Sequence, residues 1–165
     1  MDLLIVRHAI AFERNPKRWP DDGERPLSPD GMLRARKSAA GLKRIAERPV
    51  RVLTSPLVRA KQTAAILTDC AGWPKAVECV ELSPVETPEA VLEALRGIRD
   101  KRIAVVGHQP SLGQLIALCL PGGVRPEAFD LKKTGVASLS FNDSPRAGHA
   151  TLHWFLPPRI LRAVR

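Results

Sequence analysis

Two histidines, His8 and His108, each come directly after a short apolar run of the kind that forms a buried strand. Arg7 precedes the first histidine, and Arg59 follows closely after a third apolar run. Guanidinium groups bind phosphate oxygens through two parallel hydrogen bonds, and an imidazole can act as a nucleophile. Two imidazoles and two guanidiniums at one place would therefore suit a phosphoryl group, with a histidine as the candidate nucleophile.

The three apolar runs cover residues 3–6, 51–54 and 102–107. Near-continuous apolar runs of this length are typical of parallel strands that are buried on both faces. In an open α/β sheet the carboxyl ends of such strands face one crevice, and ligands bind there. The sequence therefore predicts that the two histidines and the two arginines converge at this crevice.

Four helices are predicted from a proline at the expected first helical position, where the missing N–H removes no hydrogen bond. Serine or threonine precedes three of these prolines and can cap the helix. Apolar residues recur at helical spacing after each start. The four predicted starts are Ser28-Pro29, Ser55-Pro56, Thr87-Pro88 and Gln109-Pro110.

Two segments near the carboxyl end, residues 136–141 and 150–155, flank a turn-rich stretch and predict a hairpin or a pair of edge strands. Together with the helices and parallel strands, they predict an α/β fold with three layers, α/β/α, around a mixed, mainly parallel sheet. A length of 165 residues fits one domain, so we expect residues 1–165 to form a single domain. The one long irregular stretch, residues 12–27, directly follows the first histidine, and loops of this length are often functional.

The composition narrows the classes of partner. The formal net charge of +9 favours anionic partners, whereas the aromatic content of 4% and the absence of tyrosine argue against a surface that stacks nucleic-acid bases. Three cysteines form no C-x-x-C pair, so neither a disulfide framework nor a zinc site is expected, and a cytoplasmic location is the default. The amino-terminal apolar run is too short for a signal peptide or a transmembrane helix.

Each candidate residue also has an ordinary structural explanation. A single histidine at a strand end is more often structural than catalytic, and Arg59 could be a solvated helix residue. The basic cluster in residues 34–51 is typical of a solvated helix face. A guanidinium at the end of a buried strand, however, needs an anion as a partner, so the pair Arg7-His8 favours a functional interpretation.

Several motifs resemble the histidine phosphatase superfamily, which has the phosphoglycerate mutase-like fold. These motifs are Leu4-Ile5-Val6-Arg7-His8-Ala9, residues 54–63 around Arg59, and Val106-Gly107-His108-Gln109-Pro110. Asp22-Gly23-Glu24-Arg25-Pro26-Leu27-Ser28, followed by Gly31, resembles the loop of the short SixA-type phosphohistidine phosphatase branch, as does Glu81-Leu82-Ser83-Pro84. The resemblance runs from residue 3 to about residue 156.

The resemblance implies a role for each matched residue. His8 would be the nucleophile that is transiently phosphorylated, and Arg7, Arg59 and His108 would hold the phosphoryl oxygens. Asp22 and Arg25 would belong to the loop at the rim of the site and help to bind the phosphate. The chain departs from the family in having Ala9 in place of the usual glycine, and we expect this small residue to be tolerated.

The second departure concerns the general acid. The glutamate used by the larger mutases and phosphatases of the family has no clear counterpart here, and nothing in the sequence selects among the candidates Asp22, Glu81 and Glu86. A phosphohistidine leaves as an imidazole on a labile P–N bond, whereas an alkyl phosphate leaves as an alkoxide that needs a proton. A set of phosphate-binding residues without an evident general acid therefore suits a phosphohistidine substrate.

The resulting prediction is a metal-independent phosphohistidine phosphatase that works through a phosphohistidine on His8 and needs no cofactor. Its expected partner is a phosphohistidine-bearing protein such as a histidine phosphotransfer or phosphocarrier protein. We expect a monomer that binds neither nucleic acid nor membrane. Two alternatives stay open: a small-molecule phosphomonoesterase of the same superfamily, and a non-catalytic module that binds phosphoprotein or nucleic acid.

Overall fold

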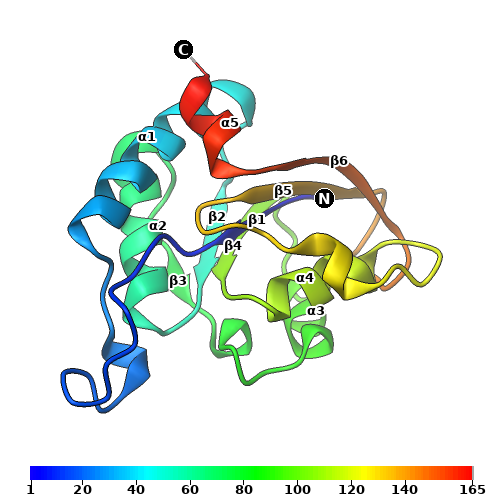
Figure 1. The fold of residues 1–165 in the computed structure, drawn as a ribbon. Helices are drawn as coiled ribbons and strands as arrows, with labels where there is room; N and C mark the ends of the chain where they lie inside the picture. The colour runs from blue at the N-terminus through cyan, green and yellow to red at the C-terminus, as the bar shows by residue number, and fades with distance from the viewer. Residues whose placement is uncertain (165) are drawn as a thin grey trace.

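The computed structural model describes residues 1–164 as a six-stranded sheet with helices on both faces (Figure 1). The strands are β1 (Asp2–Arg7), β2 (Arg51–Thr54), β3 (Val77–Glu78), β4 (Arg102–Gly107), β5 (Val136–Phe141) and β6 (Ala150–Leu156). The helices are α1 (Pro29–Ile45), α2 (Val58–Ala71), α3 (Pro88–Arg96), α4 (Ser111–Cys119) and α5 (Pro158–Ala163). Short 3-10 helices lie at η1 (Asp22–Glu24), η2 (Val80–Leu82) and η3 (Pro126–Phe129).

The sheet has the strand order β3-β2-β4-β1-β5-β6. The pairs β3-β2, β2-β4 and β4-β1 are parallel, whereas β1-β5 and β5-β6 are antiparallel. The predicted mixed, mainly parallel sheet is therefore confirmed, and the two carboxyl-terminal strands form the expected hairpin.

Alternate strand residues supply two hydrophobic cores, one on each face of the sheet. Ile5 and Val105 belong to the core beneath α3 and α4, and Val6 and Val106 belong to the core beneath α1, α2 and α5. Figure 1 shows α1, α2 and α5 gathered on one side of the sheet and α3 and α4 on the other. This is the predicted three-layer arrangement. Within residues 1–164, no helix combines the length and the apolar character needed to cross a bilayer.

The neighbouring strands β1 and β4 lead the chain toward opposite faces. β1 continues through a loop into α1, whereas β4 continues into α4 on the other face. A crevice forms beyond the carboxyl ends of two such strands, since the chain leaves them in different directions. The parallel register pairs Arg7 with Gly107, so His8 and His108 leave the sheet at the same level.

All four predicted helices form, but α2 begins two residues and α4 one residue after the predicted position. Ser28 and Thr87 cap α1 and α3 as expected, each followed by proline in the first turn. α2 instead begins at Val58 and α4 at Ser111, and neither has a side-chain cap. The Ser55 hydroxyl lies 2.8 Å from His108 Nε2 and also accepts a longer hydrogen bond, at 3.3 Å, from the Leu57 N–H just before α2. Ser55 therefore contacts the histidine as well as the chain that leads into the helix.

Candidate active site

His8 is held at the end of β1 in one orientation and one tautomer. Its backbone N–H donates to the carbonyl of Gly107 at 3.0 Å, and its side chain is 7% exposed. The ring Nδ1 lies 2.7 Å from the Ala9 carbonyl oxygen, which can only accept a hydrogen bond. Nδ1 therefore carries the proton, and in the neutral ring Nε2 keeps a free lone pair. A histidine held in this way is suited to nucleophilic attack through Nε2.

His108 lies beside it, with the two ring centroids 5.0 Å apart. Its Nε2 faces the Ser55 hydroxyl, and its Nδ1 is buried without a hydrogen-bond partner. The next residue, Gln109, donates from its amide to the Phe129 carbonyl at 2.6 Å and accepts from the Gly113 N–H at 2.8 Å. Gln109 thereby connects the start of α4 to the end of η3.

Arg7 is held by the residues that directly follow η3. Its Nη1 donates to the Leu131 carbonyl at 2.6 Å and lies 3.7 Å from Asp130 Oδ1. Thr134 holds the backbone of the same strand end, because its N–H donates to the Arg7 carbonyl at 3.1 Å and to the His8 carbonyl at 3.3 Å. Thr134 has a φ of 64°, a left-handed conformation that β-branched residues rarely adopt. The backbone at Thr134 is therefore strained, and its hydrogen bonds fix the backbone of both Arg7 and His8.

Arg59 comes from the first turn of α2 and is 5% exposed. Its Nη1 donates to the Asp22 carbonyl at 2.8 Å, and its Nη2 lies 3.3 Å from Asp22 Oδ2. Arg25 binds the same carboxylate with two hydrogen bonds, Nε to Oδ1 at 2.8 Å and Nη2 to Oδ2 at 3.2 Å. The structure therefore joins the predicted rim residues Asp22 and Arg25 to Arg59 in one ion-pair network.

Three polar atoms in this cluster lack a hydrogen-bond partner. Arg7 Nε, Arg59 Nε and His108 Nδ1 are buried and find no hydrogen-bond partner within the described residues. A buried polar group without a partner destabilises a protein by about 1–3 kcal/mol, so such groups call for an explanation. Their positions around His8 indicate a site built for the oxygens of an anion.

The motif residues beside Arg59 hold the loops in place. The Thr63 hydroxyl accepts from the Ala9 N–H at 2.9 Å and donates to the Arg59 carbonyl, while the Gln62 side chain accepts from the Leu27 N–H. Gly31 allows α1 to pack against the chain just after the nucleophile, because a Cβ there would lie 1.9 Å from the Ile10 carbonyl oxygen. Gln62, Thr63 and Gly31 thus explain why the motifs extend beyond the charged residues.

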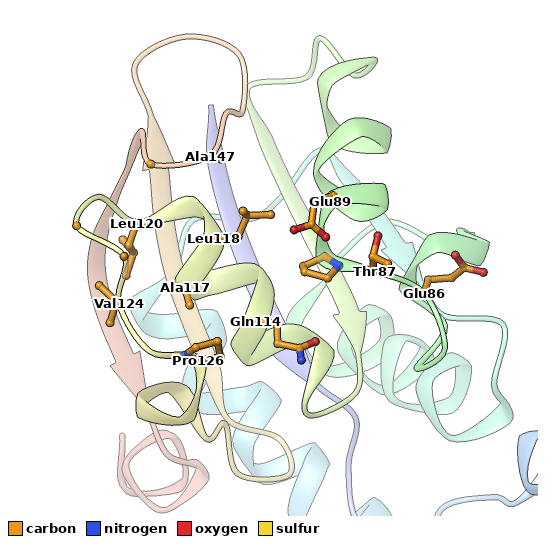
Figure 2. A pocket seen from close by; sticks show the side chains of 14 residues that line it. Glu86, Thr87, Glu89, Gln114, Ala117, Leu118, Leu120, Val124, Pro126 and Ala147 are labelled. Atoms are coloured by element: carbon orange, nitrogen blue, oxygen red, sulfur yellow. The ribbon is translucent and has the colours of Figure 1, made fainter.

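The candidate general acids lie in different surroundings. Asp22 stays ionised near neutral pH, because the hydrogen bonds from Arg25 and the nearby Arg59 and Arg14 hold its pKa below the usual range. Glu81 accepts a hydrogen bond from the Cys79 thiol, which lowers the pKa of its carboxyl. Glu86 lines an open groove of about 820 Å³ along α3 and α4 (Figure 2). The contacts described for residues 1–164 bring neither glutamate to the imidazoles.

Both histidines are neutral at neutral pH. Burial and the neighbouring His108 lower the pKa of His8 to about 3. Burial, followed by the charges of Arg59 and Arg7, lowers the pKa of His108 to about 3. A neutral His108 lacks the positive charge that a protonated ring would add, and it offers Nδ1–H to an anion when the Ser55 hydroxyl donates to its Nε2.

These pKa values predict that the protein loses stability in mild acid. Above about pH 6.5 each histidine is neutral in the folded and the unfolded chain, so it adds no pH dependence. Between about pH 6.5 and 3 the unfolded chain binds protons that the folded protein does not. The free energy of unfolding should therefore fall by about 1.4 kcal/mol per pH unit for each histidine.

Urea unfolding at pH 7, 6 and 5 measures this slope. A variant with both His8→Gln and His108→Gln serves as the control, and its stability should change much less over the same range. Equal slopes in the two proteins would contradict the assignment of the acid sensitivity to this pair.

Three features of the site have no signal in the sequence. Ser55 was expected to cap a helix, and the Leu131 carbonyl is a backbone group that any residue could supply. Lys133 stands at the rim beside the strained Thr134, and its pKa is lowered by burial and then by Arg7, Arg25 and Arg59. Within residues 1–164, no three histidine, cysteine, aspartate or glutamate side chains are grouped so that they could hold a metal ion.

Comparisons with known proteins agree with this arrangement. Residues 3–82 match the histidine phosphatase superfamily (branch 1). The chain is 31% identical over 169 residues to the phosphohistidine phosphatase SixA of Escherichia coli strain K12, an alignment that covers 100% of this chain and 99% of the relative. It is 33% identical over 159 residues to an uncharacterized protein of a Picosynechococcus strain, with 94% of each chain covered.

A solved structure of the protein histidine phosphatase SixA in complex with tungstate superposes with a TM-score of 0.84 at 30% identity. The superposition covers 98% of this chain and 99% of the other. This agreement over nearly the full length confirms the predicted fold. The chain therefore belongs to the histidine phosphatase superfamily, in its short SixA-type branch, and is a phosphatase.

Proposed function

We propose that this phosphatase removes the phosphoryl group from a phosphohistidine on a partner protein, by way of a phosphohistidine on His8. The observation that carries the proposal is the set of three buried polar atoms without partners, on Arg7, Arg59 and His108, three residues that lie close enough to His8 to lower its pKa. The SixA relative is a phosphohistidine phosphatase, and the SixA structure binds tungstate, a tetrahedral oxyanion like phosphate.

In this proposal His8 Nε2 attacks the phosphorus atom while the P–N bond to the partner's imidazole breaks. Arg7 and Arg59 donate to the phosphoryl oxygens, whose charge must be stabilised in the transition state, and His108 donates from Nδ1. Asp22 stays ionised and holds Arg25 and Arg59 in position. Water then breaks the new P–N bond on His8 and releases inorganic phosphate. The guanidinium groups supply the positive charge that a metal ion supplies in other phosphatases, so no metal is required.

The leaving group decides between substrates. Two carboxylates contact the residues that would hold the phosphate, called the clamp below (Arg7, Arg59 and His108): Asp22 pairs with Arg59, and Asp130 pairs with Arg7. Hydrogen bonds from Arg25 and from Lys132, respectively, lower the pKa of these two carboxyls, so neither is protonated near neutral pH. An alkoxide would leave slowly without a proton, whereas an imidazole leaves readily. This supports a phosphohistidine substrate, and a histidine phosphotransfer or phosphocarrier protein would present one in an exposed position.

A substrate panel tests the proposal. General acid catalysis is typically worth about 10²–10⁴ in rate, so phosphohistidine peptide and activated aryl phosphates should exceed phosphoserine peptide and sugar phosphates in kcat/KM by a margin of that order. A plot of log kcat/KM against leaving-group pKa should be steep and negative. The variants Glu81→Gln and Glu86→Gln should change the rates with phosphoserine and aryl phosphate by similar, small factors.

A flat plot, together with a large loss of phosphoserine activity in one glutamate variant, would reveal a working general acid. The small-molecule phosphomonoesterase would then be the better description. An exposed glutamate on α3, Glu93, provides the matched control as Glu93→Gln, because it pairs only with Arg96 of its own helix among the described contacts.

A further inference from the structure

Residues 12–19, called the prong below, form a projection at the rim of the site. In Figure 1 the dark blue chain after β1 extends past the helices at the lower left before it returns to η1 and α1. Residues 13–18 are all exposed. The prong therefore adds little to the hydrophobic cores, and its sequence is free to serve contacts outside the molecule.

The tip of the prong is nevertheless ordered by its own contacts. The side-chain Oδ1 of Asn15 accepts hydrogen bonds from the N–H groups of Lys17 and Arg18. The backbone carbonyl of Asn15 accepts from the N–H groups of Arg18 and Trp19. The Arg18 guanidinium lies 5.0 Å from the centre of the Phe12 ring and 4.6 Å from that of Trp19. Such cation–π contacts stabilise by about 0.5–1 kcal/mol each when exposed. The prong thus presents its charges in a fixed arrangement.

Hydrogen bonds connect the base of the prong to the phosphate clamp. Arg25 Nη1 donates to the Phe12 carbonyl at 2.7 Å, and the same guanidinium binds Asp22, which in turn pairs with Arg59. The Phe12 N–H donates to the Pro26 carbonyl at 3.1 Å. A molecule bound to the prong is therefore held in a defined position relative to His8.

The chemistry of the prong favours an acidic partner. It carries the cations Arg14, Lys17 and Arg18 and a single acid, Glu13. Both aromatic rings are occupied by the Arg18 guanidinium, which leaves them less suited to stacking nucleic-acid bases. Arg14 Nε lies 4.0 Å from Asp22 Oδ1, so the prong adjoins the residues around the clamp. Lys17 and Arg18 are exposed and available to a partner larger than a small phosphate ester.

We propose that the prong receives an acidic surface of the phosphorylated partner protein, next to the phosphohistidine. The inference rests on the proposed function, because it assigns the prong to recognition of that same substrate. Charges at the rim of an interface mainly change the rate of association and its salt dependence. The prong should therefore raise kcat/KM for acidic partners at low salt and leave the chemistry of the clamp unchanged.

The test compares two phosphohistidine peptides that differ only in their flanks, glutamates in one and lysines in the other, with p-nitrophenyl phosphate as the small substrate. The wild type should prefer the glutamate-flanked peptide by about tenfold at low ionic strength, and salt should reduce this preference. Lys17→Glu should remove most of the preference and leave the p-nitrophenyl phosphate rate unchanged. Trp19→Ala, which releases Arg18 from its stack, should act in the same direction.

Lys37→Glu is the matched control, because Lys37 is an exposed lysine on α1. An equal loss of preference in Lys37→Glu would show general charge attraction and overturn the docking role. Equal wild-type rates on the two peptides would also overturn it while leaving the proposed function intact. Hydrolysis of p-nitrophenyl phosphate but of neither peptide would instead remove the proposed function and the prong proposal together. Inhibition by a DNA duplex, with no discrimination between the peptides, would assign the prong to nucleic acid.

Discussion

Replacing His8 with asparagine should reduce phosphatase activity by a factor on the order of 10⁴ or more, the scale of losses seen when a catalytic nucleophile is removed. The Ala9 carbonyl fixes the proton on Nδ1, so Nε2 keeps the free lone pair that the proposed attack needs. His108, Arg59 and Arg7 lie close enough to His8 to lower its pKa, which is consistent with a phosphoryl group held between them. Asparagine keeps a polar side chain of similar reach but has no nucleophilic nitrogen. Steady-state assays with an aryl phosphate measure the loss directly.

Rapid quenching with labelled substrate gives a second, independent readout. The wild type should yield a phosphoprotein that is labile in acid and stable in base, as expected for phosphohistidine, and His8→Asn should yield none. His149→Asn is the matched control, since His149 is an exposed histidine. Normal turnover in His8→Asn, or an unchanged labelled band, would place the nucleophile elsewhere.

Replacing Arg59 with alanine should lower kcat/KM by about 10³, the lower end of what an arginine contributes to phosphoryl transfer. The side chain supplies one of the unpartnered donors and also holds the loop that contains Asp22. Arg59→Lys should remain at least about tenfold below the wild type, because an ammonium group cannot form the paired, planar hydrogen bonds of a guanidinium.

Arg34→Lys is the matched control for this substitution. Arg34 is exposed on α1 and pairs with Asp30 one turn away, so its replacement should leave activity unchanged. Calorimetric titration with tungstate separates binding from catalysis and should show weaker binding in both Arg59 variants. Activity of Arg59→Ala within a few-fold of the wild type would remove Arg59 from the clamp.

The elements of the fold could be predicted because each has a local signal. β1, β2 and β4 are apolar runs buried on both faces, and the hairpin of β5 and β6 shows the alternation of strands with a partly exposed face. The exact start of α2 could not be predicted, because the local sequence Ser55-Pro56 does not show that the serine contacts His108, which is far away in the sequence.

The site, too, could be predicted only in part from the sequence. The meeting of His8 and His108 follows from the register between β1 and β4, which parallel pairing makes predictable. The contribution of residues 131–134 could not be predicted, because it consists of the Leu131 carbonyl and the backbone N–H of Thr134. Backbone groups are common to all residues, and a threonine gives no indication of a left-handed φ, which β-branched residues rarely adopt.

The clamp proposed for the phosphoryl group would also fit the product of the reaction. Inorganic phosphate presents the same oxygens to Arg7 Nε, Arg59 Nε and His108 Nδ1, so these donors gain partners again after hydrolysis. A ligand that binds only the folded chain adds about 2.7 kcal/mol to its stability at a hundred times the dissociation constant. The folded fraction of this phosphatase is therefore expected to rise with the free phosphate around it. In the proposed reaction the imidazole leaves readily, so we expect the release of phosphate to limit turnover.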